Sequence, residues 1–344
     1  MKKKVTLQTI ANELGLSKSL VSKALSNHMG VNEETKEKVR LTAINMGYPI
    51  NSSILSVSSA KTGNVAVLVP REDLSDLEYW GKIFSGIEKE LSDHHFSMIL
   101  SGIDKNVSTK EGMPSCITDR RVDGALILGH VPVGYVLTVQ ALNIPIVLID
   151  VDYPYLKLDH VLADNFLGGY EAARYLLDHQ HCRVGFVGDT SYSFSFAERF
   201  RGFDSAVREY RQQSSNEIKT FYITDASTDE TLPFSIKQLE QIMQLPERPT
   251  AIMCGNDPVA FRVLQMLQGL HIRCPEDVSI IGFDNVQKCN WTTLPLTSID
   301  ACKETIGTRA VQLLFRRMNE PASRPERVMI TTEIVERNSV VYRQ

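Results

Sequence analysis

The segment between residues 17 and 25, Ser-Lys-Ser-Leu-Val-Ser-Lys-Ala-Leu, has side chains well suited to bind an anion. At helical spacing its apolar residues fall on one side of a helix, and four polar residues fall on the other: Lys18, Ser19, Ser22 and Lys23. Two ammonium groups among short hydroxyl side chains favour a charged surface that also presents polar edges. We therefore interpret this face as a candidate binding surface.

A second group of polar residues follows apolar runs of the strand type. Asp150 ends the run Val-Leu-Ile-Asp, Asp284 ends Ile-Gly-Phe-Asp, and Asn256 begins a helix after the run 251–254. Clefts in parallel-sheet folds open at the carboxyl ends of strands, so we expect these side chains to face a cleft. Carboxylates there can accept hydrogen bonds from sugar hydroxyls or from the N–H of a base.

Two short helices position the first group. Thr6 can cap a helix whose apolar residues recur at positions 7, 10, 11 and 14. Gly15 ends that helix, and Ser17 caps the next one. Two helices joined by a tight turn that contains glycine predict a helix-turn-helix, whose second helix enters the DNA major groove. The alternative is a helical hairpin that only packs on another part of the protein.

The second group requires a different architecture. From Asn64 onward, helix-like stretches separate short, continuous apolar runs: 65–69, 98–100, 125–128, 146–149, 184–187, 221–223, 251–253 and 278–282. Such alternation predicts two doubly wound parallel-sheet subdomains. The fold class is therefore an all-α helix-turn-helix headpiece followed by an α/β body.

The run from Val5 to Asn27, with Val31, the stretch 34–39 and Gly47-Tyr48, resembles the headpiece of the lactose-repressor (LacI/GalR) family. The resemblance continues to the end of the chain, in runs such as Arg-Val-Asp-Gly at 121–124 and Pro-Glu-Asp-Val-Ser-Ile-Ile-Gly-Phe-Asp at 275–284. It implies a ligand-controlled transcription regulator, usually a repressor, whose body is similar to periplasmic sugar-binding proteins.

The resemblance also implies DNA contacts. Lys18 and Ser19 open the recognition helix, and Lys23 lies one turn later on the same face. Further residues match family positions that touch phosphate or neighbouring bases: Ser17, Ser22, Asn27 and Thr35. All of these residues can instead be solvated helix-face residues, and Thr35 can simply cap or pack.

In the family, a hinge folds into a short helix on DNA, and two hinges of a dimer each insert a leucine into the minor groove. The family pattern of Asn, Ala and Leu at intervals of three is here Asn51, Ile54 and Val57, and the proline lies one position further from the asparagine than usual. We expect Val57 to be the inserted residue, with a shifted register that uses Leu55 as the alternative.

For the small molecule, the resemblance implies contacts from Tyr79 and Trp80 at the start of the first body helix, and from Arg199 in Glu-Arg-Phe-Arg-Gly-Phe. With Asp150, Asn256 and Asp284 they form the expected effector site. Trp80 can instead belong to the core, and a buried Asp–Arg pair can be purely structural. Many members have an aromatic residue where this chain has Ala226. We expect Phe194 or Phe196 to supply the missing ring.

The implied domain boundaries follow the family pattern: a headpiece at 1–48, a hinge at 49–62, an N-terminal subdomain at 63–162 and 292–324, and a C-terminal subdomain at 163–291 and 325–344. The chain then crosses between the subdomains near residues 162, 291 and 325. Pairing of the hinges implies a homodimer. Only four residues follow Val340, too few for the leucine heptads that tetramerise some members.

Charge and composition limit the alternatives. Of the net charge of −4, residues 1–62 hold nine Lys and Arg against four acids, so the head is +5 and the remainder is −9. No apolar run follows Met-Lys-Lys-Lys or reaches the length of a membrane span, and six scattered cysteines show no zinc or redox spacing, which predicts a cytoplasmic protein without a metal or cofactor.

The residue pattern disfavours two other function classes. An α/β enzyme that processes a sugar is disfavoured because the chain has no G-x-G-x-x-G, no G-x-x-x-x-G-K-[ST] and no G-x-S-x-G motif. A binding protein without gene control is disfavoured by the basic headpiece. The predicted partners are double-stranded operator DNA, a small-molecule effector and a second copy of the chain. We expect the effector to be a sugar or a sugar derivative, and we expect no membrane partner.

Overall fold

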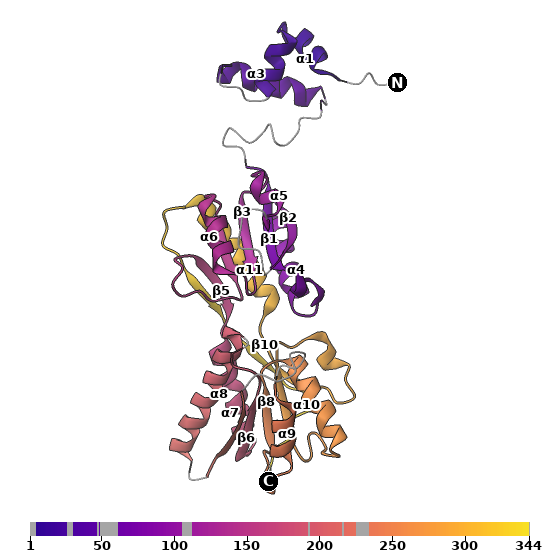
Figure 1. Cartoon of the computed structure of the whole chain (residues 1–344), viewed down its shortest axis with the longest axis vertical. Coiled ribbons are helices and arrows are strands. Elements are labelled where there is room, and N and C mark those ends of the chain that lie inside the picture. Colours follow the sequence, from indigo (N-terminus) through magenta and orange to yellow (C-terminus); the bar gives the residue numbers. More distant parts are fainter. Residues whose placement is uncertain are drawn as a thin grey trace.

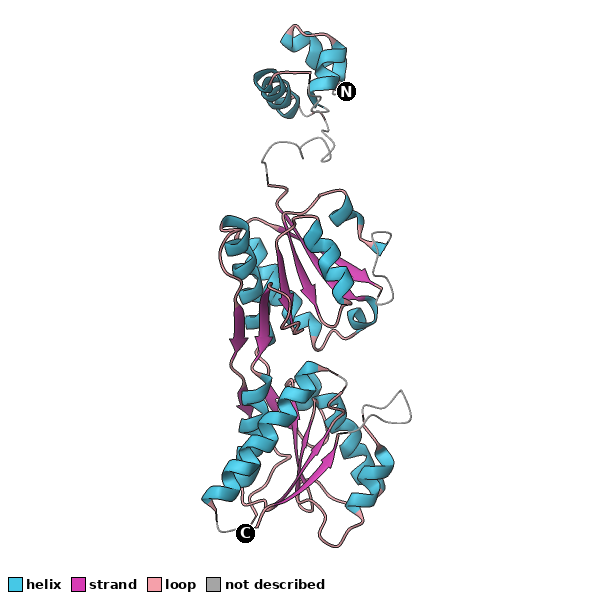
Figure 2. Ribbon diagram, turned by 60° about the vertical axis from the view of Figure 1, so that its left-hand side comes forward, coloured by secondary structure: helices cyan, strands magenta, loops and turns pink. Residues whose placement is uncertain are grey.

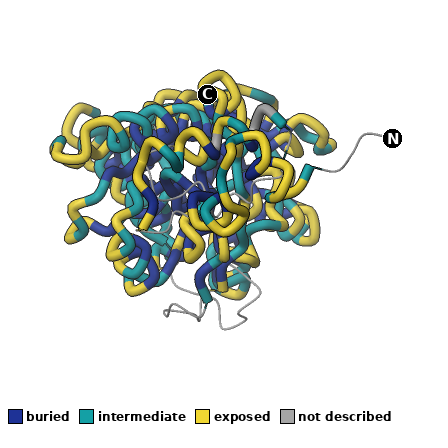
Figure 3. Tube along the Cα trace, turned by 90° about the horizontal axis from the view of Figure 1, so that it is seen from above, coloured by how far each residue is buried: buried dark blue, intermediate teal, exposed yellow. Residues whose placement is uncertain are grey.

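The computed structural model describes residues 5–25, 30–46, 48, 61–104, 112–191, 193–214, 217–224 and 234–343. In Figure 1 the headpiece helices precede a body made of two subdomains stacked end to end. None of the helices in these ranges is long and apolar enough to cross a bilayer. Viewed along the long axis, the buried residues run through the middle of the body and the exposed ones surround them (Figure 3).

The headpiece contains helices α1 (Leu7–Leu14), α2 (Lys18–Leu25) and α3 (Glu33–Asn45). Thr6 and Thr9 form a reciprocal capping box at the start of α1, and Gly15 ends that helix with φ of 64°. The Ser17 hydroxyl accepts a hydrogen bond from the backbone N–H of Leu20 at 3.1 Å. The predicted helix-turn-helix and its cap residues are therefore confirmed.

A small hydrophobic core of its own holds these three helices together. Its buried members come only from the headpiece: Ile10, Ala11, Val21, Ala24, Leu25, Val31, Val39 and Ala43. Burial of the apolar stripe of α2 against α1 and α3 leaves its opposite face exposed to solvent. The predicted division of α2 into a packed side and a free side is what the structure shows.

The N-terminal subdomain is built on a six-stranded parallel sheet. In spatial order its strands are β11 (Arg327–Ile330), β5 (Asp159–Ala163), β4 (Ile146–Ile149), β3 (Gly124–Leu128), β1 (Asn64–Pro70) and β2 (Ser97–Ile103). Helices α4 (Trp80–Asp93) and α11 (Lys303–Asn319) pack on one face. Helices α5 (Ser115–Thr118) and α6 (Val133–Ala141) pack on the other, and η2 (Arg71–Ser75) follows β1.

The C-terminal subdomain repeats this plan. Its strands lie in the order β12 (Glu333–Val335), β10 (Thr297–Asp300), β9 (Ser279–Phe283), β8 (Ala251–Cys254), β6 (Arg183–Val187) and β7 (Lys219–Ile223). Only β12 is antiparallel to its neighbour. Helices α7 (Asn165–Asp178) and α8 (Phe194–Gln213) cover one face, and α9 (Ile236–Met243) and α10 (Asp257–Gly269) cover the other, with η4 (Gln287–Asn290) beside α10.

Both sheets therefore have helices on both faces, as Figure 2 shows, and the predicted fold class is confirmed. Each predicted strand is present. The correspondence of the two strand orders makes β4 of one sheet the equivalent of β9 in the other. The residues that follow these two strands, Asp150 and Asp284, therefore occupy equivalent places in the two subdomains.

Two of the expected crossing points are wrong. Strand β10 pairs with β9 in the C-terminal sheet, so the chain returns to the N-terminal subdomain only after Asp300, not near 291. Strand β11 pairs with β5 in the N-terminal sheet, so the last crossing follows Ile330, not 325. Hydrogen bonding to neighbouring strands, which residue patterns do not reveal, decides both cases. The first crossing lies between β5 and α7.

Candidate functional site: a cleft between the subdomains

A cleft of about 1840 Å³ opens where the two subdomains meet. This volume exceeds the roughly 300–1,000 Å³ of most small-molecule pockets because the hollow continues over the surface of α10 and η4, past Phe261 and Trp291. Its inner part is lined by the ends of β4 and β9 and by the first turns of α4 and α8. The six expected effector residues all belong to its lining: Tyr79, Trp80, Asp150, Arg199, Asn256 and Asp284.

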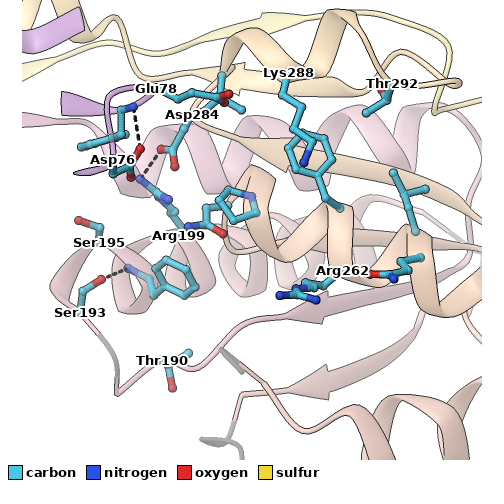
Figure 4. Close-up of a pocket in the computed structure, with 18 of the residues that line it drawn as sticks. Asp76, Glu78, Thr190, Ser193, Ser195, Arg199, Arg262, Asp284, Lys288 and Thr292 are labelled. Atoms are coloured by element: carbon cyan, nitrogen blue, oxygen red, sulfur yellow. Dashed lines mark hydrogen bonds and ion pairs between the residues drawn. The ribbon is translucent and has the colours of Figure 1, made fainter. Parts of the chain in front are cut away.

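The floor of the C-terminal side is an ion pair that is shielded from solvent. Nη2 of Arg199 donates to Oδ1 of Asp284 at 3.0 Å, and the two side chains are 3% and 7% exposed. Nε of Arg199 donates to Asn165 at 2.8 Å, and Nη1 donates to the carbonyl of Gly255 at 2.8 Å. Figure 4 shows Arg199 directed at Asp284, with Asp76 of the other subdomain beside them. A guanidinium held at three points is a rigid group for recognition.

Two helices approach closely to place this arginine. A Cβ atom on Gly169 of α7 would lie 2.0 Å from the backbone oxygen of Arg199, and one on Gly202 of α8 would lie 2.0 Å from that of Phe166. Only glycine permits this contact between the backbones of α7 and α8. The guanidinium also stacks 3.7 Å above the ring of Phe283, the last residue of β9.

On the N-terminal side, the hydroxyl of Tyr79 donates to Oδ2 of Asp150 at 2.7 Å. The other oxygen, Oδ1, is shielded from solvent and accepts no hydrogen bond from the described residues. Burial raises the pKa of Asp150 to about 6, although the Tyr79 hydroxyl and the nearby guanidinium of Arg199 oppose the shift. This carboxyl thus changes its charge close to neutral pH.

The two strand-end carboxylates are placed by the same backbone geometry. Asp150 has φ of 55° and Asp284 has φ of 101°, both in the left-handed region. The N–H of Asp150 bonds to Val161 of β5, and the N–H of Asp284 bonds to Ile299 of β10, which is the equivalent strand. Each subdomain therefore contributes one strand-end carboxylate to the cleft, as the strand-end rule predicts.

Asn256 and Trp80 have additional structural roles. The side-chain oxygen of Asn256 caps α10 by accepting from the N–H of Val259 at 3.0 Å. Trp80 is 7% exposed, belongs to the hydrophobic core and packs edge-on against Tyr79, with ring centroids 4.9 Å apart. Both the core interpretation and the cleft interpretation of Trp80 thus describe part of what the residue does.

The residue pattern did not reveal several other groups in the cleft or next to it. Lys303, the first residue of α11, is 1% exposed and donates from Nζ to the backbone oxygen of Asp284, so it links the two subdomains. Thr190, Ser193 and Ser195 add hydroxyl groups, all labelled in Figure 4. Ser193 was recognisable as the cap of a helix, whereas a lone lysine before an amphipathic helix gives no signal.

Two phenylalanines are the candidates for the aromatic ring that position 226 lacks. Phe194 and Phe196 both line the cleft. Phe196 is buried, and the guanidinium of Arg327 lies 5.5 Å from the ring of Phe194. Residue 226 itself lies outside the described residues.

In the headpiece, the five expected DNA-contacting residues on and before α2 are all exposed: Ser17, Lys18, Ser19, Ser22 and Lys23. Thr35 is half-buried, and the cap of α3 is not Thr35 but Asn32, whose side chain accepts from the N–H of Thr35 at 2.8 Å. Asn27, Asn51, Leu55 and Val57 lie outside the described residues. Within the described ranges, no group of three potential metal ligands comes together.

Residues 173–340 match the family model of a periplasmic binding protein-like domain. The HTH-type transcriptional repressor PurR of Escherichia coli is 26% identical over 338 residues, covering 97% of this chain and 96% of the repressor. PurR of Mannheimia succiniciproducens is also 26% identical, over 97% of this chain and 98% of that one.

Solved structures agree with these relatives. The lac repressor dimer bound to operator and the anti-inducer ONPF matches with a TM-score of 0.70 at 19% identity, over 98% of this chain and all of that one. A LacI family regulator from Enterococcus faecalis with bound ribose matches with a TM-score of 0.65 at 26% identity, over 81% of this chain and all of that one. Over nearly its whole length the chain is thus similar to transcriptional repressors, and over its body it is similar to a regulator of the LacI family.

Proposed function

We propose that this protein is a cytoplasmic transcriptional repressor that binds a roughly palindromic operator as a homodimer and is controlled by a sugar or sugar derivative in the cleft. Its relatives are repressors, so it is a regulator and not an enzyme. The observation that carries the proposal is the exposed face of α2 on a self-contained helix-turn-helix, joined to a body with a polar cleft between two subdomains.

On DNA, α2 enters the major groove with Lys18 and Ser19 at its leading end. Lys18 donates to the O6 and N7 acceptors of a guanine, and Lys23 contacts the adjacent position. Ser17, Ser22, Asn27 and Thr35 contact phosphates or neighbouring bases. Residues 1–48 form the DNA-binding unit and residues 49–62 the hinge, in which Asn51 and Val57 approach the minor groove.

In the body, strand pairing supports an N-terminal subdomain up to residue 163 that includes α11 and β11, and a C-terminal subdomain that includes β10 and β12. The effector lies between them, against Tyr79 and Trp80 of one and Arg199, Asn256 and Asp284 of the other. Asp150 accepts a hydrogen bond from the effector on the N-terminal side. The bound effector fixes one relative orientation of the subdomains and thereby decides whether both headpieces of the dimer reach their half-sites.

A gel-shift experiment with the full-length protein and a pool of randomised palindromic duplexes tests the DNA part. The wild type should enrich one sequence, and the double variant Lys18→Ala, Lys23→Ala should enrich none, while thermal unfolding of its body is unchanged. Thermal unfolding against a panel of sugars, sugar phosphates, nucleobases and amino acids tests the effector part. A ligand at about a hundred times its dissociation constant adds about 2.7 kcal/mol of stability. Stabilisation by a nucleobase alone would refute the sugar assignment.

A further inference from the structure

The two walls of the inner cleft differ in charge. Among the described residues that line it, the N-terminal subdomain contributes five carboxylates and no lysine or arginine: Asp73, Asp76, Glu78, Asp150 and Asp152. Asp152 forms an ion pair with Arg327 at 2.9 Å and is therefore neutralised. Asp76 and Glu78 are exposed at the rim, and Asp150 lies deeper. This wall attracts a positively charged ligand.

The cations nearby do not balance these acids. Arg199 and Lys303 both lie close enough to Asp150 and to Asp284 to act on these two carboxyls, and the negative charge of Asp76 acts on Asp284 as well. Three carboxylates against two cations leave one negative charge in excess. Both cations already hydrogen-bond within the protein, Arg199 to the carboxylate of Asp284 and Lys303 to its backbone oxygen. One additional positive charge, supplied by a ligand, would balance the charges of these side chains.

The place for that charge is next to Asp150. Its Oδ2 accepts from the Tyr79 hydroxyl, while Oδ1 has no donor among the described residues although it is shielded from solvent. A shielded acceptor without a donor is costly, and a ligand N–H restores the missing hydrogen bond. The ring of Tyr79 beside it has the ammonium group of Lys303 at 5.7 Å from its centroid, so the surroundings of Asp150 already accommodate a cation.

The opposite wall has different chemistry. Thr190, Ser191, Ser193 and Ser195, from the loop after β6 and the start of α8, line it with hydroxyl groups. Short hydroxyl side chains both donate and accept, which suits the hydroxyls of a sugar. The cleft therefore has an acidic side for an ammonium group and a hydroxyl-rich side for a polyol.

From these two walls we propose that the effector is an amino sugar with a free, protonated amine, the amine facing Asp150 and the sugar hydroxyls facing the serine and threonine side chains. This inference rests on the proposed function, because it narrows the sugar effector to one chemical class.

Calorimetric titration of the full-length protein with matched compounds tests the proposal. Glucosamine, glucose and N-acetylglucosamine share a pyranose ring and differ only in the group at C2, which is a protonated amine, a neutral hydroxyl or a neutral acetamide. The galacto and manno series offer the same comparison. In at least one series the free amine should bind at least tenfold more tightly than both neutral compounds. Asp150→Asn should abolish that preference, whereas Asp93→Asn, which removes an exposed carboxylate at the end of α4, should retain it.

The dependence on pH gives a second readout that does not require a variant. Tyr79, Asp284, Arg199 and Lys303 face Asp150, and burial raises the pKa of Asp150 to about 6. Affinity for the amine should therefore rise between pH 5 and 7 as Asp150 ionises, and affinity for a neutral hexose should not. If the Asp150→Asn variant does not fold, Glu78→Gln removes another negative charge from the same wall. It should weaken binding of the amine and leave binding of the neutral hexose unchanged.

The outcomes separate this inference from the proposed function. Equal binding of the free amine and the neutral hexose would overturn the amino-sugar assignment and leave the sugar effector intact. No binding by any compound of the three series would overturn the amino sugar, and no stabilisation by any sugar or sugar phosphate of the panel, with operator binding still present, would overturn the sugar effector as well. In that case the DNA-binding function would stand alone.

Discussion

At the residue scale, the headpiece makes a sharp prediction for Lys18. The side chain is exposed at the first position of α2, where recognition helices read base edges. Lys18→Ala should cost about 1–3 kcal/mol for the preferred base at one operator position and relax the preference there. Binding to a set of operators with single base changes measures this. A uniform loss over all sequences would identify Lys18 as a phosphate contact, and Lys89→Ala on α4 is the control with an equal change in charge.

A second prediction concerns His181, which is 1% exposed. Its ring hydrogen-bonds to the Thr250 hydroxyl and to the backbone oxygen of Val341, both at 3.0 Å, and burial lowers its pKa to about 4. In the unfolded chain His181 takes up a proton near pH 6.5, whereas in the folded protein it stays neutral down to about pH 4. The protein therefore loses stability as the pH falls from about 6.5 to 4.

Denaturant unfolding of wild type and His181→Asn over this pH range isolates the effect. The difference between the two proteins should change by about 2 kcal/mol across the window. The comparison removes the opposite contributions of Asp150 and Asp257, whose pKa values burial raises to about 6 and about 7. His95→Asn, in an exposed turn, should show the same pH dependence of the free energy of unfolding as the wild type. If His181→Asn also showed the wild-type pH dependence, the prediction would be contradicted.

The site was predictable where a residue ends a continuous apolar run. Asp150 and Asp284 follow such runs, and the strand-end rule alone brings them to one cleft. The resemblance to a known family was needed for Arg199 and Tyr79. Lys303 was not predictable, because its burial depends on a contact with the backbone of Asp284, nineteen residues earlier and in the other subdomain.

At the scale of elements, two of the missed strands, β5 and β10, share a physical reason. The eight predicted strands are apolar apart from Ser279, whereas β5 begins Asp-His and β10 reads Thr-Ser-Ile-Asp. Tertiary pairing buries these polar residues: Asp159 of β5 bonds to Arg317 of α11 at 2.7 Å, and Ser298 of β10 donates to Asp257 at 2.6 Å. Missing β10 and β11 misplaced two crossings, because both strands lie next to a crossing.

The close contact of α7 and α8 gives a prediction at the same scale. A methyl group at Gly202 would collide with the backbone of Phe166, so Gly202→Ala should force the helices apart and lower the free energy of unfolding by about 1–3 kcal/mol. Because Arg199 lies on the same helix, effector binding should weaken as well. Gly269→Ala at the end of α10 has open space around the new methyl and should leave both unchanged. Thermal unfolding of both variants measures the loss of stability, and calorimetry measures the loss of effector affinity.

At the scale of the whole molecule, function depends on coupling between two sites on different units. The cleft lies between the subdomains, and the DNA-binding face lies on a headpiece with its own core. Lys303, the contact of Arg327 with Phe194 and the three crossings are among the described connections through which the effector biases the relative position of the subdomains. Such coupling amounts to about 1–3 kcal/mol in most allosteric proteins.

Because this coupling is an equilibrium property, it is reciprocal. The factor by which the effector changes operator affinity, about 5- to 150-fold, must equal the factor by which operator changes effector affinity. Calorimetric titration of effector with and without saturating operator duplex should reproduce the factor obtained from operator binding with and without effector. Lys303→Met should reduce both factors together while the dimer still binds operator. A variant that lost one factor and kept the other would show that the two measurements report different equilibria, and the cleft would then not be the site that controls the headpieces.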